Sequence, residues 1–587
     1  MNFHEEEILG KAFDSRLMKR LLKFLYPYRY KVALAVSLLL ITAVTQLAGP
    51  FLTKIAIDRY IAHGNIHGLK LIAVIYFAIL GLEYIISFVH QYLTAWIGQN
   101  VMFDIRAKIF THLQKLPLSF FDKNPVGRLV TRTTNDVETL NNMLSSGVVA
   151  IFGDVFVLVG IIIVMINLNW QLALLTFTVL PFIIYASFLF RKKVRESYRK
   201  IRLRIARINS YLQENISGMA TVQIFNREKK NLQQFKELND SYKEAHLETI
   251  KYYAIFFPTI EIISSLALAL ILWYGGIKII DHTLTLGIVV AFVQYSERFF
   301  QPIRDLSDKY NIMQAAMASS ERIFRLLDAP EQIMVPENYI PLPPAKGEIE
   351  FQNVTFSYNG TDNVLKDVSF KIKPGEKVAV VGATGAGKTS LISLITRMYE
   401  PTQGKILMDG VDTSRLKVQE LRRRIGVVLQ DVFIFSGNIE DNIRLGNRDI
   451  SFEQIVEAAK NVNAHKFIEK LSHNYQHKLS ERGSNLSVGQ KQLLSFARAL
   501  AFNPKILILD EATSSVDTET EHLISDAINK LMQFRTSLII AHRLSTIQHA
   551  DWILVLHKGE IRERGTHQEL LKQGGIYHRL YQLQFNK

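Results

Sequence analysis

Eight consecutive residues in the second half of the chain have side chains and a spacing that suit phosphate binding. They are Gly382, Ala383, Thr384, Gly385, Ala386, Gly387, Lys388 and Thr389. Glycines let backbone N–H groups curl around phosphate oxygens, and the helix expected from Ser390 onward would add a partly positive N-terminus. The Lys388 amine can reach the β- and γ-phosphates of a nucleotide, and the Thr389 hydroxyl can hold Mg2+. Because a short apolar strand is also expected directly upstream, over 377–381, we infer that the chain binds a nucleoside triphosphate.

Two carboxylates and a histidine follow apolar strands further along the chain. Asp510 and Glu511 follow the apolar run 506–509, and His542 follows the run 537–541. Asp510 could orient Mg2+ through water, and Glu511 could polarise the attacking water as a general base. His542 could donate a hydrogen bond to the γ-phosphate. Singly, an acid pair at a strand end is often only solvated and a lone histidine is usually structural, but their joint order favours a hydrolytic site.

The 587-residue chain is too long for one ordinary domain, and its two halves differ in character. Apolar runs of membrane-spanning length recur in the first half, whereas the second half is typical of a soluble α/β domain. The formal net charge of +15 could indicate nucleic acid. However, the dense basic run 191–207 directly follows a membrane-length apolar segment, which favours a cytoplasmic helix extension instead. The chain contains no cysteine, which excludes disulfides and thiolate metal sites.

Six membrane spans are expected in the first half. Their approximate limits are 31–57, 69 onward, a third ending near 167–169, 170–190, 251–280 and 285–305. Gly49 and Pro50 predict a kink in the first span. Residues 15–30 alternate basic and apolar side chains at helical spacing, which predicts an amphipathic helix on the inner membrane surface. Basic residues cluster in the two long inter-span regions and near the ends, so those regions are expected in the cytoplasm.

Three acidic residues lie within the apolar runs assigned to spans two, three and five. They are Glu83, Asp154 and Glu261. Ionisable groups at membrane depth are costly and usually face a cavity or a partner. Because all three are acidic, we expect a substrate cavity that favours lipophilic cations. The alternative is that one or more of them pairs with a Lys or Gln on a neighbouring helix, or lies near the lipid head groups.

Further short stretches stand in a fixed order around the phosphate loop. They are Tyr358, Gln430, the run Leu486-Ser487-Val488-Gly489-Gln490, and Asp517. With the phosphate loop, Asp510, His542 and the six-span half, this set resembles the ABC transporter family. The resemblance covers nearly the whole chain, and it is closest to the half-size exporters of bacteria that carry drugs or lipids.

The resemblance implies a role for each matching residue. Tyr358 would stack on adenine, and Gln430 would contact Mg2+ and the membrane half. Asp510 would be the Walker B carboxylate, Asp517 the D-loop aspartate and His542 the switch histidine. The implied catalytic residues are Glu511, His542, Gln430 and Lys388; the implied Mg2+ contacts are Thr389, Gln430 and Asp510; the implied nucleotide contacts are Tyr358, the residues 382–390 with Ser390 included, Gln430, Ser487, Gly489, Gln490 and Asp517. The turns at 120–128 and 217–221 match the two coupling helices.

The expected fold is multi-domain: an all-α transmembrane domain of six helices, followed by an α/β P-loop NTPase of the ABC ATPase type. The transmembrane domain, with its N-terminal elbow helix, would span 1–328. A proline-containing linker would span 329–347, and the ATP-binding cassette would span 348–587.

The signature run Leu486–Gln490 implies that the chain acts as a dimer. In the resembling family its Ser and Gly contact the γ-phosphate held by the other subunit. Val488 departs from the usual glycine, and its branched side chain restricts the backbone. Heterodimeric exporters of this family often divide the two features between their chains. One chain keeps the catalytic Glu but has an altered signature, and the other keeps the common signature but lacks the Glu. We therefore expect a second ABC half-transporter as partner, with a heterodimer favoured over a homodimer.

The sequence thus predicts ATP-driven export of hydrophobic or amphipathic, cationic compounds by alternating access, with ATP and Mg2+ as cofactors. The partners would be the second half-transporter, membrane lipid and the small cargo, without nucleic acid. The protein would lie in a bacterial cytoplasmic (inner) membrane, with the cassette on the cytoplasmic side. The first alternative is a flippase for lipids or lipid-linked glycans. The second is an ATP-gated membrane protein without active transport, although Glu511 and His542 argue against it. Fusion of the two halves disfavours an importer.

Overall fold

The computed structural model describes residues 14–331, 339–510, 518–541 and 547–585. The chain forms two compact units, which are described separately. The first comprises Met1–Gln114 and Val126–Ala329, and the second comprises Lys115–Pro125 and Pro330–Lys587. The predicted site residues Glu511, Asp517 and His542 lie outside the described residues.

The first unit is built from helices, several of them much longer than a membrane is thick. Its α-helices are α1 (Ser15–Leu25), α2 (Arg29–Ile55), α3 (Ile66–Leu113), α5 (Val126–Thr133), α6 (Asn135–Asn142), α7 (Val149–Leu168), α8 (Trp170–Phe177), α9 (Leu180–Ser217), α10 (Met219–Ile224), α11 (Glu228–Ile280) and α12 (Leu286–Leu327). Two π-helical segments interrupt them, Ala56–Ile61 after α2 and Met143–Val148 before α7.

Five helical segments among the described residues are long and apolar enough to cross a membrane. They are Ser15–Ile61, Ile66–Leu113, Val126–Leu168, Trp170–Ser217 and Glu228–Ile280. The sixth predicted span lies within α12, which is not one of these five, so the count of six stays a prediction. The predicted amphipathic helix is present as α1, where Leu21 is buried and the basic Lys19 and Lys23 are exposed.

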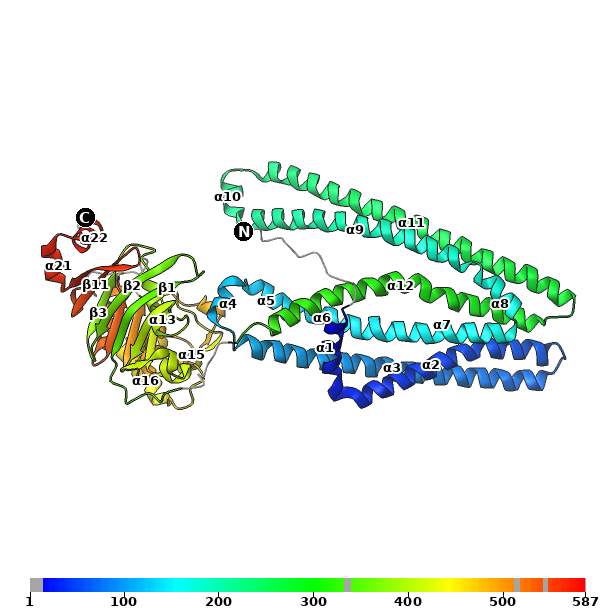
Figure 1. The fold of residues 1–587 in the computed structure, drawn as a ribbon, viewed down its shortest axis with the longest axis horizontal. Coiled ribbons are helices and arrows are strands. Elements are labelled where there is room, and N and C mark those ends of the chain that lie inside the picture. Colours follow the sequence, from blue (N-terminus) through cyan, green and yellow to red (C-terminus); the bar gives the residue numbers. More distant parts are fainter. Residues whose placement is uncertain (1–13, 332–338, 511–517, 542–546, 586–587) are drawn as a thin grey trace. The chain divides into compact units, whose positions relative to one another are not determined.

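The helices α9 and α11 run side by side as a long antiparallel pair, and the short α10 lies at the tip where they are joined (Figure 1). Ser197 of α9 and Thr249 of α11 share a buried hydrogen bond of 2.7 Å between their hydroxyls. At the tip, Ile224 and Phe225 are about 70% exposed, at 73% and 69%. The pair therefore presents an apolar end that nothing in the chain covers among the described residues.

The second unit contains two main sheets. The first is antiparallel, in the order β2-β1-β4-β5; the second has the order β12-β11-β3-β10-β9-β6. The strands are β1 (Ile349–Ser357), β2 (Asn363–Ile372), β3 (Lys377–Val381), β4 (Gln403–Met408), β5 (Val411–Asp412), β6 (Ile425–Val428), β9 (Ile506–Asp510), β10 (Thr536–Ile540), β11 (Trp552–His557) and β12 (Glu560–Gly565), with a small pair of β7 (Gly437–Asn438) and β8 (Lys478–Leu479).

The central strands β3, β9 and β10 are parallel and are buried almost throughout. Their residues alternate between two apolar cores: Leu507 and Leu509 of β9 belong to one, and Ile506 and Ile508 to the other. A strand covered on both faces is expected to be continuously apolar, which explains why these runs could be recognised in the sequence.

The second unit also contains ten α-helices among the described residues. They are α4 (Leu118–Lys123), α13 (Lys388–Ile395), α14 (Val418–Arg423), α15 (Ile439–Arg444), α16 (Phe452–Asn461), α17 (His465–Ile468), α18 (Val488–Ala501), α19 (Thr518–Met532), α21 (His567–Gln573) and α22 (Ile576–Phe585). The helix α4 belongs to the second unit although it lies in the first half of the sequence. Its neighbours in the sequence, α3 and α5, both belong to the first unit. The helix α4 overlaps the first part of the turn at 120–128 that is predicted as a coupling helix.

Candidate functional site

The phosphate loop joins β3 to α13, as its strand–loop–helix context requires. Gly387 has φ 101°, a left-handed conformation that favours glycine, immediately before the first turn of α13. A Cβ added to Gly382 would lie 2.2 Å from the Leu556 carbonyl oxygen. The loop is thus held close to β11 in a form that only glycine allows, with the N-terminus of α13 facing the loop.

Lys388 is largely buried inside this loop. Its Nζ donates to the carbonyl oxygens of Gly382 at 2.7 Å and Ala383 at 3.2 Å. Burial lowers the pKa of the Lys388 amine, and the nearby Asp510 carboxylate opposes that shift. The two carbonyl acceptors are neutral, so they do not neutralise the charge of the buried ammonium. A phosphate could do so, and the geometry therefore fits a nucleotide.

Asp510 ends β9 with only 8% of its surface exposed. Burial raises its pKa; Lys388 lowers it and Asp431 raises it further. The strand β6 pairs in parallel with β9, so Gln430, just after β6, lies at the same sheet edge and is exposed. With the exposed Thr389 hydroxyl, these oxygen donors have the hard-ligand chemistry that Mg2+ prefers.

Tyr358 lies beside the phosphate loop, as the adenine-stacking role requires. Its hydroxyl and that of Ser390 on α13 are 3.0 Å apart in a hydrogen bond. Its ring meets those of Phe356 and Tyr399 edge-on, with centroids 4.7 and 5.0 Å away, and 42% of the residue is exposed. The accessible ring surface is available for a base to stack on.

Tyr399 was not singled out from the sequence, yet it connects this site to α4. Its phenol donates a hydrogen bond to the carboxylate of Asp122. Burial, followed by this hydrogen bond, raises the pKa of Tyr399. In the same unit Lys115 and Glu331 form an ion pair of 3.5 Å. No local sequence pattern marks Tyr399, because the contact joins segments far apart in the chain.

The last three residues of the signature run, Val488 to Gln490, form the first turn of α18, and Ser487 is its N-cap. Ser487 and Gln490 form a capping box: the Ser487 Oγ accepts from the Gln490 N–H at 3.2 Å, and the Gln490 Oε1 accepts from the Ser487 N–H at 3.0 Å. The capping box is what starts the helix there. Gly489 is buried, whereas Val488 is 55% exposed.

Of the three acids predicted for a cargo cavity, Asp154 has a visible counter-charge. Its carboxylate forms an ion pair with Lys309 of α12. Glu83 is half-buried in α3 and Glu261 is exposed on α11. The structure therefore places Asp154 in the pairing that the alternative interpretation described.

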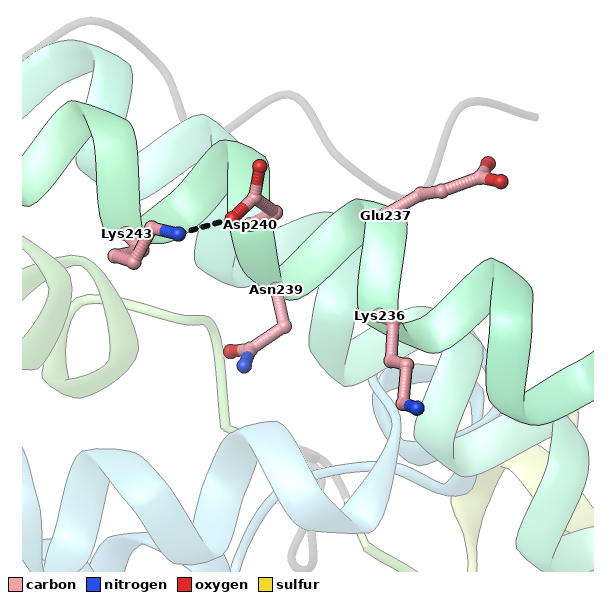
Figure 2. Close-up of a pocket in the computed structure, with 5 residues that line it drawn as sticks. All are labelled: Lys236, Glu237, Asn239, Asp240 and Lys243. Carbon is pink, nitrogen blue, oxygen red and sulfur yellow. Dashed lines mark hydrogen bonds and ion pairs between the residues drawn. The ribbon is translucent and has the colours of Figure 1, made fainter.

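A shallow hollow on α11 carries none of the predicted site residues. Figure 2 shows its lining, Lys236, Glu237, Asn239, Asp240 and Lys243, with an ion pair between Lys243 and Asp240. These are solvated side chains on one helix surface, so we assign no site to it.

Comparison with known proteins gives the same assignment for both halves. The family model described as ABC transporter transmembrane region matches residues 32–303, and the model described as ABC transporter matches residues 365–514. This chain belongs to the ABC transporter family, as the half-size exporter type. The findings confirm the predicted fold class, ATP hydrolysis coupled to transport, and an integral inner-membrane location.

The individual relatives are similar over nearly their full length. An "Uncharacterized ABC transporter ATP-binding protein YknV" of Bacillus subtilis is 39% identical, over 100% of this chain and 97% of the relative. An "ATP-dependent lipid A-core flippase" of Syntrophus aciditrophicus is 37% identical, over 97% and 95%. A solved structure described as a bacterial Atm1-family ABC exporter with ATP bound has a TM-score of 0.79 at 27% identity, covering 95% of this chain and 99% of its own.

Proposed function

We propose that this chain exports hydrophobic or amphipathic compounds across the membrane by alternating access, as one half of a dimer. The observation that carries the proposal is the set formed by Lys388, Asp510 and the phosphate loop on one sheet edge, which is connected through Tyr399 to α4. In the sequence α4 lies between α3 and α5, which belong to the helical unit. In this proposal a change at the nucleotide site is passed to the membrane helices through α4.

The chain's own residues bind and orient the nucleotide in this proposal. Lys388 neutralises phosphate charge, Tyr358 orients the base, and Thr389, Gln430 and Asp510 would hold Mg2+, which supplies charge neutralisation during phosphoryl transfer. Glu511 would orient the attacking water, and His542 would hold the γ-phosphate. The signature residues Ser487, Gly489 and Gln490, with Asp517, would complete the partner's site.

The dimer is proposed to be a heterodimer. The sequence combines an intact Glu511 with an altered signature at Val488, and this combination supports a heterodimer. The exposed apolar tip at Ile224 and Phe225 supports a partner of some kind, because such a surface costs free energy in water. We assign the tip to the partner's cassette, in keeping with the second coupling helix that the family resemblance implies.

The preferred cargo predicted from Glu83, Asp154 and Glu261 is a lipophilic cation. Lys309 balances the charge of Asp154, which removes that acid from the argument for a cation preference. A lipid or lipid-linked glycan flippase is the second candidate, favoured by the similarity to a relative that is named a lipid A-core flippase.

The test is to purify the chain, alone and co-expressed with candidate half-transporters, and to reconstitute it in liposomes. ATPase activity that rises on adding cargo, with cargo accumulating across the bilayer, is expected. Nucleotide binding without transport of any amphipathic compound would favour an ATP-gated membrane protein instead.

A further inference from the structure

Two charged residues on α12, Glu297 and Arg298, lie within the predicted sixth span but have no role so far. Both are exposed, whereas Tyr295 and Phe299 on the same helix are buried in the core of the first unit. A charged side chain facing lipid at membrane depth is costly, so such residues normally face a cavity or a partner. The face of α12 that carries Arg298 is therefore expected to line the interior of the assembled dimer.

The Arg298 side chain is anchored to α2 one turn before Pro50. The guanidinium Nη1 donates a hydrogen bond to the backbone carbonyl of Gln46. That carbonyl would normally accept from the amide four residues later, but residue 50 is Pro50, which has no N–H. The Tyr295 hydroxyl donates to the neighbouring Leu47 carbonyl at 2.6 Å. The missing N–H of Pro50 thus leaves an acceptor that gives Arg298 a defined orientation.

The remaining donors of the guanidinium converge with a second donor group beside Gly49. Arg298 Nη2 lies 3.5 Å, and the Tyr76 hydroxyl 3.6 Å, from the position that a Cβ on Gly49 would take. Among the described residues, Arg298 donates a hydrogen bond to the Gln46 carbonyl alone. The Tyr76 hydroxyl has no hydrogen-bond partner among them. A guanidinium has five N–H donors, so most of them are available to a ligand.

We propose that Arg298 and Tyr76 bind the anionic head group, carboxylate or phosphate, of an amphipathic cargo; this inference rests on the proposed export function, and it replaces the cation preference expected from the three acids. The planar guanidinium matches both oxyanions, and a charge-assisted hydrogen bond at membrane depth is strengthened by the low dielectric. Successive residues of an α-helix point about 100° apart, so Glu297 does not share the direction of Arg298. Because the site joins α2, α3 and α12, its ligand also bridges three membrane helices.

The test measures equilibrium binding and ATPase stimulation in phosphatidylcholine liposomes containing the assembled dimer. The probes share one dodecyl chain: dodecyl phosphate, dodecanoate, dodecanol and dodecyltrimethylammonium. The wild-type protein should bind the two anions more tightly than dodecanol. Arg298→Gln should weaken anion binding about tenfold, the loss of one good charged contact, while dodecanol binding changes less than about twofold.

Three variants separate this site from a general charge effect. Arg59→Gln removes an exposed arginine just beyond α2, the helix that carries Gln46, and should leave anion binding unchanged. Pro50→Ala restores the amide that pairs with the Gln46 carbonyl, so Arg298 loses its anchor and part of the anion preference while the charge remains. Arg298→Lys should recover only part of the binding, because an ammonium lacks the planar fork.

Equal binding of anions and dodecanol by the wild-type protein would overturn the site. So would an equal loss in Arg59→Gln, or tighter binding of dodecyltrimethylammonium, which would instead support the acid-lined cavity. Anion binding that depends on Arg298 without any stimulation of the ATPase would retain the site and count against the export function.

Discussion

The phenol of Tyr399 donates a hydrogen bond to the carboxylate of Asp122, a residue 277 positions earlier in the chain. Tyr399 also packs edge-on against Tyr358, whose hydroxyl is hydrogen-bonded to Ser390 at the start of α13. Arg422 fixes the other end of that helix, donating to the carbonyls of Thr396 and Arg397, both at 3.0 Å. A series of side-chain contacts therefore leads from the phosphate loop to α4.

Removing the Tyr399 hydroxyl should uncouple hydrolysis from transport. Tyr399→Phe keeps the ring that packs on Tyr358 but loses the hydrogen bond to Asp122. Asp122→Asn keeps an acceptor oxygen but removes the charge that strengthens this hydrogen bond. We expect basal ATPase within about twofold of wild type, with cargo-stimulated ATPase and transport reduced about fivefold, the loss of roughly 1 kcal/mol of coupling. The double variant should be no worse than either single one; additive losses would show that the two residues act separately.

Removing the general base should abolish hydrolysis without abolishing binding. Glu511→Gln is expected to reduce turnover at this chain's own site by about 100-fold or more while ATP binding persists. Lys388→Ala should weaken nucleotide binding itself, because the buried ammonium is the charge that meets the phosphates. Near-normal turnover of Glu511→Gln in a complex whose partner site is inactive would contradict the assignment of Glu511.

Replacing Asp510 should stabilise the nucleotide-free protein while removing its Mg2+-dependent activity. Burial raises the pKa of Asp510, so between its ordinary and its raised pKa the folded state holds a proton that the unfolded state has lost. Stability therefore falls as pH rises through that window. Asp510→Asn should raise the melting temperature near neutral pH by about 2–4 °C, as ~1 kcal/mol does for a domain of this size. The gain should shrink as the pH is lowered toward the ordinary pKa of an aspartate, because the folded protein then keeps the proton on Asp510; a gain independent of pH would have another cause.

The acid-lined cavity can be tested by neutralising all three acids together. Glu83→Gln, Asp154→Asn and Glu261→Gln should weaken binding of cationic dyes more than that of neutral dyes if they face the cargo. Lys309 complicates the set, because Asp154→Asn leaves it without its counter-charge. The variant Asp154→Asn with Lys309→Met is the control that removes the pair together. Equal weakening of both dye classes would remove the basis for a cation preference.

The heterodimer can be tested by expressing the chain alone and with a second half-transporter. Activity that appears only on co-expression is expected, since this chain's Glu511 site needs the partner's signature. Val488→Gly should then raise turnover at the partner's site only if that partner retains a base. A stable homodimer with cooperative, cargo-stimulated ATPase would contradict the prediction.

Local sequence determined much of the cassette and the general plan of the membrane half. The residues 377–381 were predicted as a strand and form β3, because a parallel strand buried on both faces is apolar throughout. The phosphate loop was recognised because its glycines and Lys388 must stand at set positions for the backbone to curl around an anion. The first five spans were visible as long apolar runs, since length and composition alone decide whether a helix can cross a bilayer.

Only the tertiary structure decided which distant residues meet. The pairing of Asp154 with Lys309, and of Arg298 with the Gln46 carbonyl, depends on how α12 packs against α7 and α2. The hydrogen bond between Tyr399 and Asp122 depends on α4 leaving the helical unit to join the second one. Such contacts leave no periodic or spacing signal, because each is a relation between two surfaces that exist only once the chain has folded.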